Sequence, residues 1–313
     1  MKDRTGEKIV FSLPSFYDAV YDYEDAEYVI FGVPFDCTSS YRAGSRWAPD
    51  EMRKACMNFE TYDYYHRSDM TDILVHDAGN MDTPVSADDM LSELYDEVAG
   101  LLDDGKFPIM LGGEHSLSYA PVKACRDHYE RKDREEEKDP EGITFLVLDA
   151  HLDMRTDFRG VKYNHACVSR HIIEEVTPKY VTIGVRSGPE EEWDYMEEHG
   201  IPFYTSDDVD ERGIREIIKE VSEKIEGDRI YLSLDMDVID PAYCAGLGTP
   251  EPFGLSPREV REVLRAFAPK TIGFDIVEIA PEYDFGNSAL LATKLMREFI
   301  FAREAGRKKC KTK

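Results

Sequence analysis

The 313-residue sequence lacks long apolar runs, has few cysteines and is poor in positive charge. No run of eighteen apolar residues occurs, which excludes a membrane-spanning helix of ordinary length. The cysteines are scattered, and none forms a C-x-x-C pair, so neither a zinc ribbon nor a disulfide framework is indicated. We predict that most of them are buried free thiols. They are Cys37, Cys56, Cys125, Cys167, Cys244 and Cys310.

The charge balance is strongly acidic. Only 38 Lys and Arg residues oppose 64 Asp and Glu residues, for a formal net charge of −26. Such a surface repels phosphate backbones and argues against a nucleic-acid partner. Two interpretations remain: adaptation to a salty cytoplasm, which we rank first, and attraction of a cationic substrate. The only basic block lies at about 306–313, and we interpret it as a frayed terminus.

The first eight residues are charged and have no apolar signal core behind them, which predicts a cytoplasmic protein without a membrane partner.

Apolar runs and helix signals alternate along the chain. Strands are predicted at 28–35, 72–79, 107–115, 144–148, 180–185, 201–204, 229–235 and 271–278. Helices are predicted from Pro49, at 86–104, from about 118, at 214–225, at 256–267 and from 287 to about 303. The strands are continuous apolar runs, which is typical of an α/β fold with a parallel sheet covered on both faces. No linker divides the chain, so 1–313 is interpreted as one domain, and a closed (β/α)8 barrel stays open as an alternative.

The run 144–148 ends in Asp149, His151 and Asp153. If the chain stays extended, a spacing of two places the three side chains on one side. Two carboxylates and an imidazole suit a divalent ion such as Zn, Mn or Ni. The local alternative is a helix-capping aspartate and an exposed histidine.

Other strands also end in acids or histidine. Sites in parallel α/β folds gather outside the carboxyl ends of the strands. Taken singly, each residue has a local explanation as a cap, a turn acid or a strand-end acid. Together they would repel one another without cations, so we predict two divalent ions sharing bridging carboxylates. The additional residues are His115, Asp235, Asp237 and Glu278, and the neighbouring Asp240 is considered only as a loop or turn acid.

Three strings carry a family resemblance. They are Gly112-Gly-Glu-His-Ser116, Asp149-Ala-His-Leu-Asp153 and Ser233-Leu-Asp-Met-Asp-Val-Ile-Asp-Pro241. In this order they resemble the metal-binding signatures of the ureohydrolases, the arginase and agmatinase family. The resemblance implies a three-layer α/β/α fold with an eight-stranded, mostly parallel sheet (the arginase-like fold). It also implies two Mn²⁺ ions per subunit and a homotrimer or homohexamer.

The resemblance also implies roles for individual residues. One ion would be held by His115, Asp149, Asp153 and Asp235, and the other by His151, Asp149, Asp235 and Asp237, although Ni²⁺, Co²⁺ or Zn²⁺ would also bind such ligands. A hydroxide bridging the ions would attack the guanidinium carbon, with Asp153 relaying its proton. His165 matches the histidine that protonates the leaving amine; its local alternative is a loop or capping histidine. Glu278 matches the carboxylate that pairs with the guanidinium, and Thr249 would support it.

The substrate loops favour the agmatinase branch, in which agmatine is hydrolysed to putrescine and urea. No Asn follows Asp153 directly, unlike in arginases. Ala245, Leu247 and Phe253 replace the usual Pro, Thr and Gly, which leaves substrate fit open. Aminopropylagmatine, arginine and guanidinobutyrate are alternatives, and Arg155 or Arg159 would suit an acidic tail.

Two functions of other classes also stay open. One is a zinc deacetylase of acetylpolyamines, and the other is a non-catalytic polyamine-binding oligomer. Asp237 and the intact aspartate signature favour two metals and hydrolysis.

Overall fold

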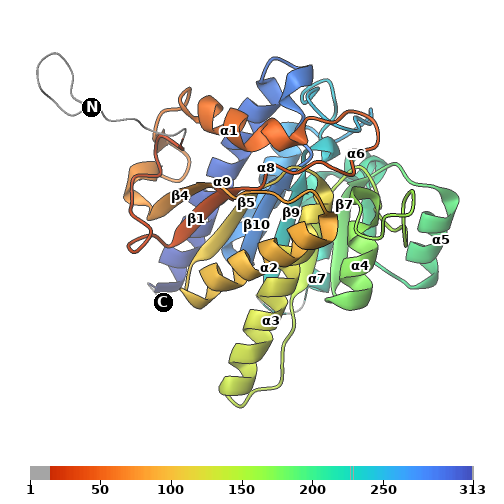
Figure 1. Cartoon of the computed structure of the whole chain (residues 1–313), viewed down its shortest axis with the longest axis horizontal. Coiled ribbons are helices and arrows are strands. Elements are labelled where there is room, and N and C mark those ends of the chain that lie inside the picture. The colour runs from red at the N-terminus through yellow and green to blue at the C-terminus, as the bar shows by residue number, and fades with distance from the viewer. Residues whose placement is uncertain (1–14, 226, 228, 312–313) are drawn as a thin grey trace, which may run out of the picture.

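The computed structural model describes residues 15–225, 227 and 229–311, with side chains described up to residue 308. A central sheet crosses the molecule (Figure 1) in the strand order β4-β1-β5-β10-β9-β6-β7-β8. Every neighbouring pair in it is parallel. Its strands are β1 (Tyr28–Gly32), β4 (Val75–Asn80), β5 (Phe107–Leu111), β6 (Thr144–Leu148), β7 (Tyr180–Val185), β8 (Phe203–Thr205), β9 (Ile230–Asp235) and β10 (Thr271–Val277). The predicted parallel sheet is confirmed, and the two free edges, β4 and β8, exclude a closed barrel.

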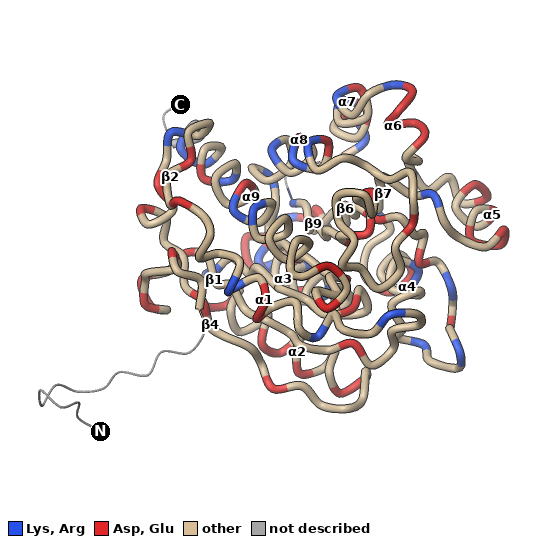
Figure 2. The backbone as a smooth tube through the Cα atoms, turned by 90° about the horizontal axis from the view of Figure 1, so that it is seen from above, with Lys and Arg blue, Asp and Glu red and all other residues tan. Residues whose placement is uncertain are grey.

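Helices cover both faces of the sheet. One layer contains α2 (Ala87–Asp103), α3 (Tyr119–Glu135) and α4 (Val168–Glu175). The other contains α1 (Ala48–Cys56), α7 (Ile214–Lys224), α8 (Pro257–Phe267) and α9 (Asn287–Lys311). Figure 2 shows α7, α8 and α9 on one side of the strands and α2 and α4 on the other. The predicted three-layer α/β/α arrangement is therefore confirmed.

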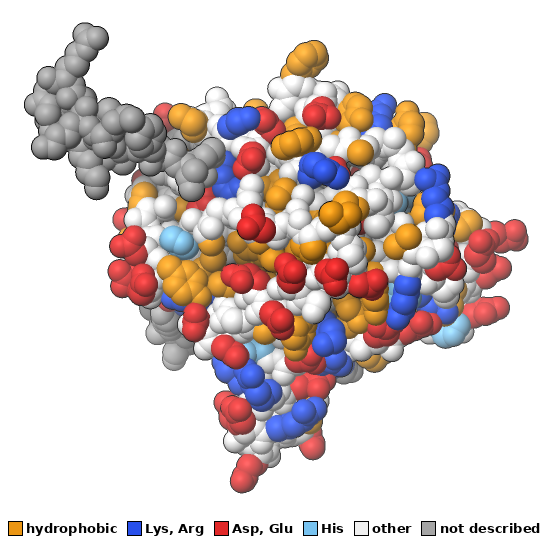
Figure 3. Space-filling model, viewed as in Figure 1, with side chains coloured by type: hydrophobic (Ala, Val, Ile, Leu, Met, Phe, Trp, Pro, Cys, Tyr) orange, Lys and Arg blue, Asp and Glu red, His pale blue; other side chains and the backbone are white. Residues whose placement is uncertain are grey.

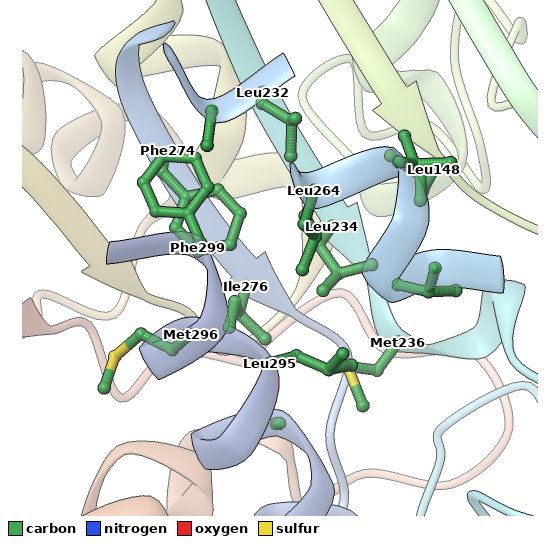
Figure 4. Close-up of a cluster of buried hydrophobic side chains, with 14 of the residues drawn as sticks. Leu148, Leu232, Leu234, Met236, Leu264, Phe274, Ile276, Leu295, Met296 and Phe299 are labelled. Atoms are coloured by element: carbon green, nitrogen blue, oxygen red, sulfur yellow. The ribbon is translucent and has the colours of Figure 1, made fainter. Parts of the chain in front are cut away.

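The inner strands are buried along their whole length, which explains their continuous apolar sequences. Every residue of β1, β5, β6, β7, β9 and β10 is buried. Alternate residues of one strand pack against different helix layers because successive side chains point to opposite faces. In Figure 4, Leu232 and Phe274 lie with Leu264 and Phe299 of the α8–α9 layer, and the rings of Phe274 and Phe299 stack 4.0 Å apart. Each such buried side chain contributes about 1.5–3 kcal/mol of hydrophobic stabilisation.

Several short elements escape the sequence analysis. They are α4, α5 (Glu190–Glu198), α6 (Ser206–Arg212) and a hairpin of β2 (Tyr62–Asp63) and β3 (Ser68–Asp69). The three helices have only 8, 9 and 7 residues, too few turns for a clear apolar periodicity. Strand β4 also begins later than predicted, because Met70–Asp72 form a 3₁₀ turn.

The C-terminal helix is longer than predicted. It continues to Lys311 and includes most of the basic block that we interpreted as a frayed terminus. That interpretation is wrong for the described part, because Arg307 pairs with Glu27 and Glu304. Residues 312–313 lie outside the described part.

Of the predicted free thiols, Cys56, Cys125, Cys167 and Cys244 are buried, while Cys37 is exposed. The side chain of Cys310 lies outside the described part. Among the described helices, none combines the length and the apolar character that a membrane crossing requires. Acidic side chains are spread over many elements of the face in Figure 3, between basic and apolar ones.

Candidate metal centre and its cleft

The candidate ligands meet where four adjacent strands end. Strands β5, β10, β9 and β6 are consecutive neighbours in the sheet. His115 begins the 3₁₀ helix His115–Ser118 that follows β5, Asp149 follows β6, Asp235 ends β9 and Glu278 follows β10. The predicted convergence at the carboxyl edge is thus what the strand order produces.

Two groups of ligand atoms lie side by side. In the first, Nδ1 of His115 lies 3.0 Å from Asp149 Oδ2, 3.1 Å from Asp153 Oδ2 and 3.3 Å from Asp235 Oδ2. In the second, Nδ1 of His151 lies 2.9 Å from Asp237 Oδ2 and 3.7 Å from Asp149 Oδ1. Ligand atoms of His115, Asp149 and Asp235 lie within 4.8 Å of one another, as do those of Asp149, His151 and Asp237. Asp149 belongs to both groups, which is the geometry of a shared, bridging carboxylate.

Asp153 reaches this site by a different route from the one predicted. Strand β6 ends at Leu148, so the alternation of an extended chain does not continue. Asp153 instead has a backbone φ of 54°, a left-handed conformation that turns the chain and brings its carboxylate to His115. Asp240 stays outside the site, where it accepts the backbone N–H groups of Ala242 and Gly254 and acts as a turn acid.

The candidate ligand carboxylates are buried and crowded together. Burial and the charge of Asp149 raise the pKa of Asp153 to about 7. Burial and the charges of Asp237 and Asp149 raise the pKa of Asp235 well above its usual range. Nδ1 of His115 and Oδ2 of Asp149 are buried without a hydrogen-bond partner among the described residues. These side chains therefore fit divalent cations, which would replace protons between the carboxylates and take up the unpaired atoms.

A polar pair behind His115 fixes the orientation of its ring. Ser233 Oγ donates to Asp275 Oδ1 at 2.6 Å and lies 3.2 Å from Nε2 of His115. Because the serine hydrogen points to Asp275, the serine oxygen accepts the Nε2–H, and Nδ1 keeps its lone pair for an ion. Neither residue was predicted from the sequence, where the available signal was one polar residue inside each of two apolar runs.

A cleft of about 360 Å³ opens over the centre. Its lining includes the histidines and acids already named together with Glu278, His165 and Thr249. Glu278 has a backbone φ of 64° and accepts the backbone N–H of His115 at 2.7 Å. Burial, chiefly, raises its pKa to about 8. Thr249 donates its hydroxyl to Asp237 Oδ2 at 3.2 Å and so contacts a candidate ligand, while its support of Glu278 stays a prediction.

The cleft is also lined by an ion pair, Arg155 with Glu192, that was not predicted from the sequence. Arg155 Nε donates to Glu192 Oε1 at 2.9 Å, and Glu192 Oε2 accepts the backbone N–H of Met154 at 3.2 Å. The guanidinium of Arg155 also lies over the ring of Phe158, 4.5 Å from its centroid. Of the two arginines considered for an acidic tail, Arg155 lines the cleft, and Arg159 is not among the lining residues.

Removing metal should make the stability of the protein depend on pH. The pKa of Asp153 is raised to about 7, so the fold loses the stability linked to this carboxyl as pH rises from about 4 to 7. Burial lowers the histidine pKa values, but Asp149 for His115 and Asp237 for His151 outweigh it and raise both well above 6.5. Their stabilisation is complete below pH 6.5 and is lost as pH rises through the higher folded-state values. Both effects lower the stability of the metal-free protein as pH rises.

We therefore expect the chelator-treated protein to have a Tm lower at pH 8 than at pH 5.5, by about 5 °C or more. With Mn²⁺ added, the fall in Tm between pH 5.5 and pH 8 should largely disappear, because the ions replace the protons held by the carboxylates and histidines. Differential scanning calorimetry of both forms measures this. Equal Tm values of the chelated protein at the two pH values would contradict it.

Fold and site together define the class of protein: an α/β enzyme with a carboxylate and histidine centre for divalent cations at the carboxyl edge of its sheet. The sequence matches the model of the arginase family over residues 26–302. The chain belongs to the arginase family, and the ureohydrolase resemblance of the three motifs is confirmed.

Similar proteins agree with this assignment. The chain is 41% identical to the agmatine ureohydrolase of Thermoplasma volcanium, whose crystal structure superposes with a TM-score of 0.87 and covers 96% of this chain and 97% of that one. It is 34% identical to the agmatinase of Bacillus anthracis over 95% of this chain and 96% of the relative. It is also 34% identical to the N(1)-aminopropylagmatine ureohydrolase of Thermococcus kodakarensis, over 87% and 89% of the two chains.

Proposed function

We propose that this protein hydrolyses the guanidino group of agmatine to putrescine and urea at a centre of two Mn²⁺ ions. The observation that carries the proposal is that Asp149 is shared by two groups of ligand atoms below a cleft that also holds Glu278 and His165. Relatives named agmatinase and agmatine ureohydrolase support the choice of substrate.

Six side chains would hold the ions: His115, Asp149, Asp153 and Asp235 at one position, and His151, Asp149, Asp235 and Asp237 at the other. Bound divalent ions supply Lewis acidity and a strong oxygen nucleophile at neutral pH. Imidazole with carboxylates suits Mn²⁺ and also Ni²⁺, Co²⁺ or Zn²⁺, so the native metal needs its own measurement.

The side chains around the centre bind the substrate and transfer protons. Glu278 accepts N–H bonds from the guanidinium and holds its carbon over the centre. Asp153 takes the proton that the attacking water loses. His165 gives a proton to the departing nitrogen, so that the C–N bond breaks to urea and a neutral amine instead of an amide anion.

The pairing of Arg155 with Glu192 favours a substrate without an acidic tail. A carboxylate tail would have to compete with Glu192 for Arg155, whereas an amine tail meets a pair that is already neutral. Aminopropylagmatine is the nearest alternative, because it has the same guanidino end and an amine tail, and one relative is named for it. Arginine and guanidinobutyrate follow.

Urea release from a substrate panel tests the proposal. The protein is stripped of metal, reloaded with Mn²⁺ and assayed with agmatine, aminopropylagmatine, arginine, guanidinobutyrate and guanidine at low and high salt. We expect agmatine to be hydrolysed with the highest kcat/KM and the Asp237→Ala variant to be inactive. If urea came chiefly from another compound, the proposed reaction would stand and that compound would replace agmatine as the substrate. No urea from any compound at either salt level would overturn the proposal and turn attention to zinc-dependent deacetylation and to polyamine binding without catalysis.

Assembly and location are further parts of the proposal. A homotrimer or homohexamer in the cytoplasm is what the family resemblance and the sequence lead us to propose. Exposed large side chains, among them Trp47, Tyr283 and Phe285, would suit an interface. Sedimentation velocity of the Mn²⁺-loaded protein distinguishes monomer, trimer and hexamer.

A further inference from the structure

The loop that follows β1 contacts His165 through Thr38, beside the cleft. Within it, the backbone N–H of Thr38 donates to Glu114 Oε2 at 2.7 Å, and the Thr38 hydroxyl lies 2.7 Å from Glu114 Oε1. Ser116 donates its hydroxyl to the same Oε1 at 2.6 Å. Glu114 is fully buried and directly precedes His115. The loop is thus anchored to the segment that carries a candidate metal ligand.

The same hydroxyl oxygen contacts His165 twice. Thr38 Oγ1 lies 3.2 Å from the backbone nitrogen of His165 and 3.2 Å from its ring Nδ1. A hydroxyl has one hydrogen to donate and two lone pairs to accept with. Its three polar contacts are therefore one carboxylate and two nitrogens of His165.

The hydrogens available to each partner determine which group donates in each contact. The hydroxyl donates its only hydrogen to Glu114 Oε1 at 2.7 Å. The backbone nitrogen of His165 can only donate, and it fills one lone pair of Thr38 Oγ1. The remaining lone pair faces Nδ1, which must then carry the ring hydrogen. The other ring nitrogen, Nε2, keeps its lone pair.

We propose that Thr38 is a positioning residue, which with Glu114 holds His165 in the Nδ1–H tautomer so that Nε2 handles the proton given to the leaving amine. The proposal rests on the proposed function for the identity of that amine. The proton that Asp153 takes from the attacking water passes to Nε2, and Nε2 gives it up as the electron pair of the C–N bond moves to the amine nitrogen. While the ring is positive, Nδ1–H donates to Thr38 and Thr38 donates to Glu114, so the buried carboxylate stabilises the charge through one hydroxyl.

The tautomer matters because His165 is neutral in its resting state. Burial and the neighbouring His151 and His115 lower the pKa of His165 to about 4. A neutral ring has one hydrogen, so the partner of Nδ1 decides which nitrogen can accept a proton.

Three variants separate positioning from packing. Thr38→Val keeps the shape and removes the hydroxyl, and Thr38→Ser keeps the hydroxyl. Ser39→Ala removes the next hydroxyl of the loop, for which no hydrogen bond to another described residue is found. With the guanidino compound that the wild type hydrolyses best, we expect Thr38→Val to lower kcat about 10- to 100-fold with KM changed by less than about threefold. Thr38→Ser and Ser39→Ala should stay within about threefold of the wild type. A Thr38→Val kcat within twofold of the wild type, or an equal loss in Thr38→Ser, would overturn the proposal.

The tautomer can also be measured directly, without activity. The wild-type protein is labelled with ¹⁵N-histidine and loaded with diamagnetic Zn²⁺, and the His165→Asn variant assigns the signals. We expect a protonated Nδ1 and an unprotonated Nε2 at pH 8. A protonated Nε2 on His165 would overturn the proposal even if Thr38→Val fails to fold. If no substrate yields urea but the Nδ1–H form is found, the proposed function fails while the positioning of His165 stands.

Discussion

Replacing Asp149 by asparagine is expected to lower kcat/KM of the Mn²⁺-loaded protein by about 10³-fold or more. Asp149 is the side chain that both groups of ligand atoms share, so its loss weakens both metal positions at once. Asparagine keeps an oxygen that can accept the backbone N–H of His151, now 2.6 Å from Asp149 Oδ1. The backbone should therefore stay in place while the bridging charge is lost. Urea release and metal content by mass spectrometry measure the two effects, and we expect fewer than two ions per chain.

The same substitution should change the stability of the metal-free protein less than that of the metal-loaded protein. The charge of Asp149 raises the pKa of both Asp153 and Asp235, which means that the three carboxylates repel one another. Removing one charge relieves this repulsion but also removes the carboxylate that pairs with His115, so Tm should change little in the chelated form and fall in the loaded form. Asp240→Asn is the matched control, because this turn acid lies outside the site. Two bound ions with near wild-type activity in Asp149→Asn would contradict the assignment of a bridging ligand.

The second large effect is expected at Glu278. Glu278→Gln should lower kcat/KM about 10²- to 10³-fold while two ions remain bound. The glutamine oxygen can still accept the N–H of His115, but its amide NH₂ would face the donors of the guanidinium. A charge-assisted pair that orients the substrate is thus replaced by a clash of donors.

Steady-state kinetics and metal analysis of the same preparation distinguish loss of substrate pairing from loss of metal. If Glu278→Gln loses metal as well, Glu278 supports metal binding instead of only pairing with the substrate. If kcat/KM stays within about fivefold of the wild type, the guanidinium is held elsewhere.

The strands and the ligands were predictable because their signals are local. Most strands of the central sheet are short apolar runs, and each ligand lies within a few residues of the end of such a run. The order of the strands was not predictable in this way, since it depends on pairing between distant segments. For the same reason Ser233 and Asp275 were missed, although they face each other on β9 and β10. Thr38 was missed because only the fold brings its loop to His165.

The spacing pattern predicted Asp153 correctly as a site residue, but the predicted extended conformation was wrong. The spacing of two in Asp149, His151 and Asp153 suggested one side of an extended strand. In the structure, the third residue reaches the site through a left-handed turn, with a φ of 54°. Such a conformation costs about 1–3 kcal/mol for a residue with a Cβ, and a sequence pattern does not reveal it.

The position of β10 sets an order of events while the chain is being made. It is the last strand in sequence, yet it lies between β5 and β9. Before it emerges from the ribosome, β4, β1 and β5 can form one half-sheet and β9, β6, β7 and β8 another, with no strand to join them. His115 belongs to the first half, whereas Asp149, His151, Asp235 and Asp237 belong to the second. In the proposed centre, the position that includes His115 would therefore be completed late in biosynthesis, and a nascent chain stopped before Thr271 would expose two sheet edges to aggregation.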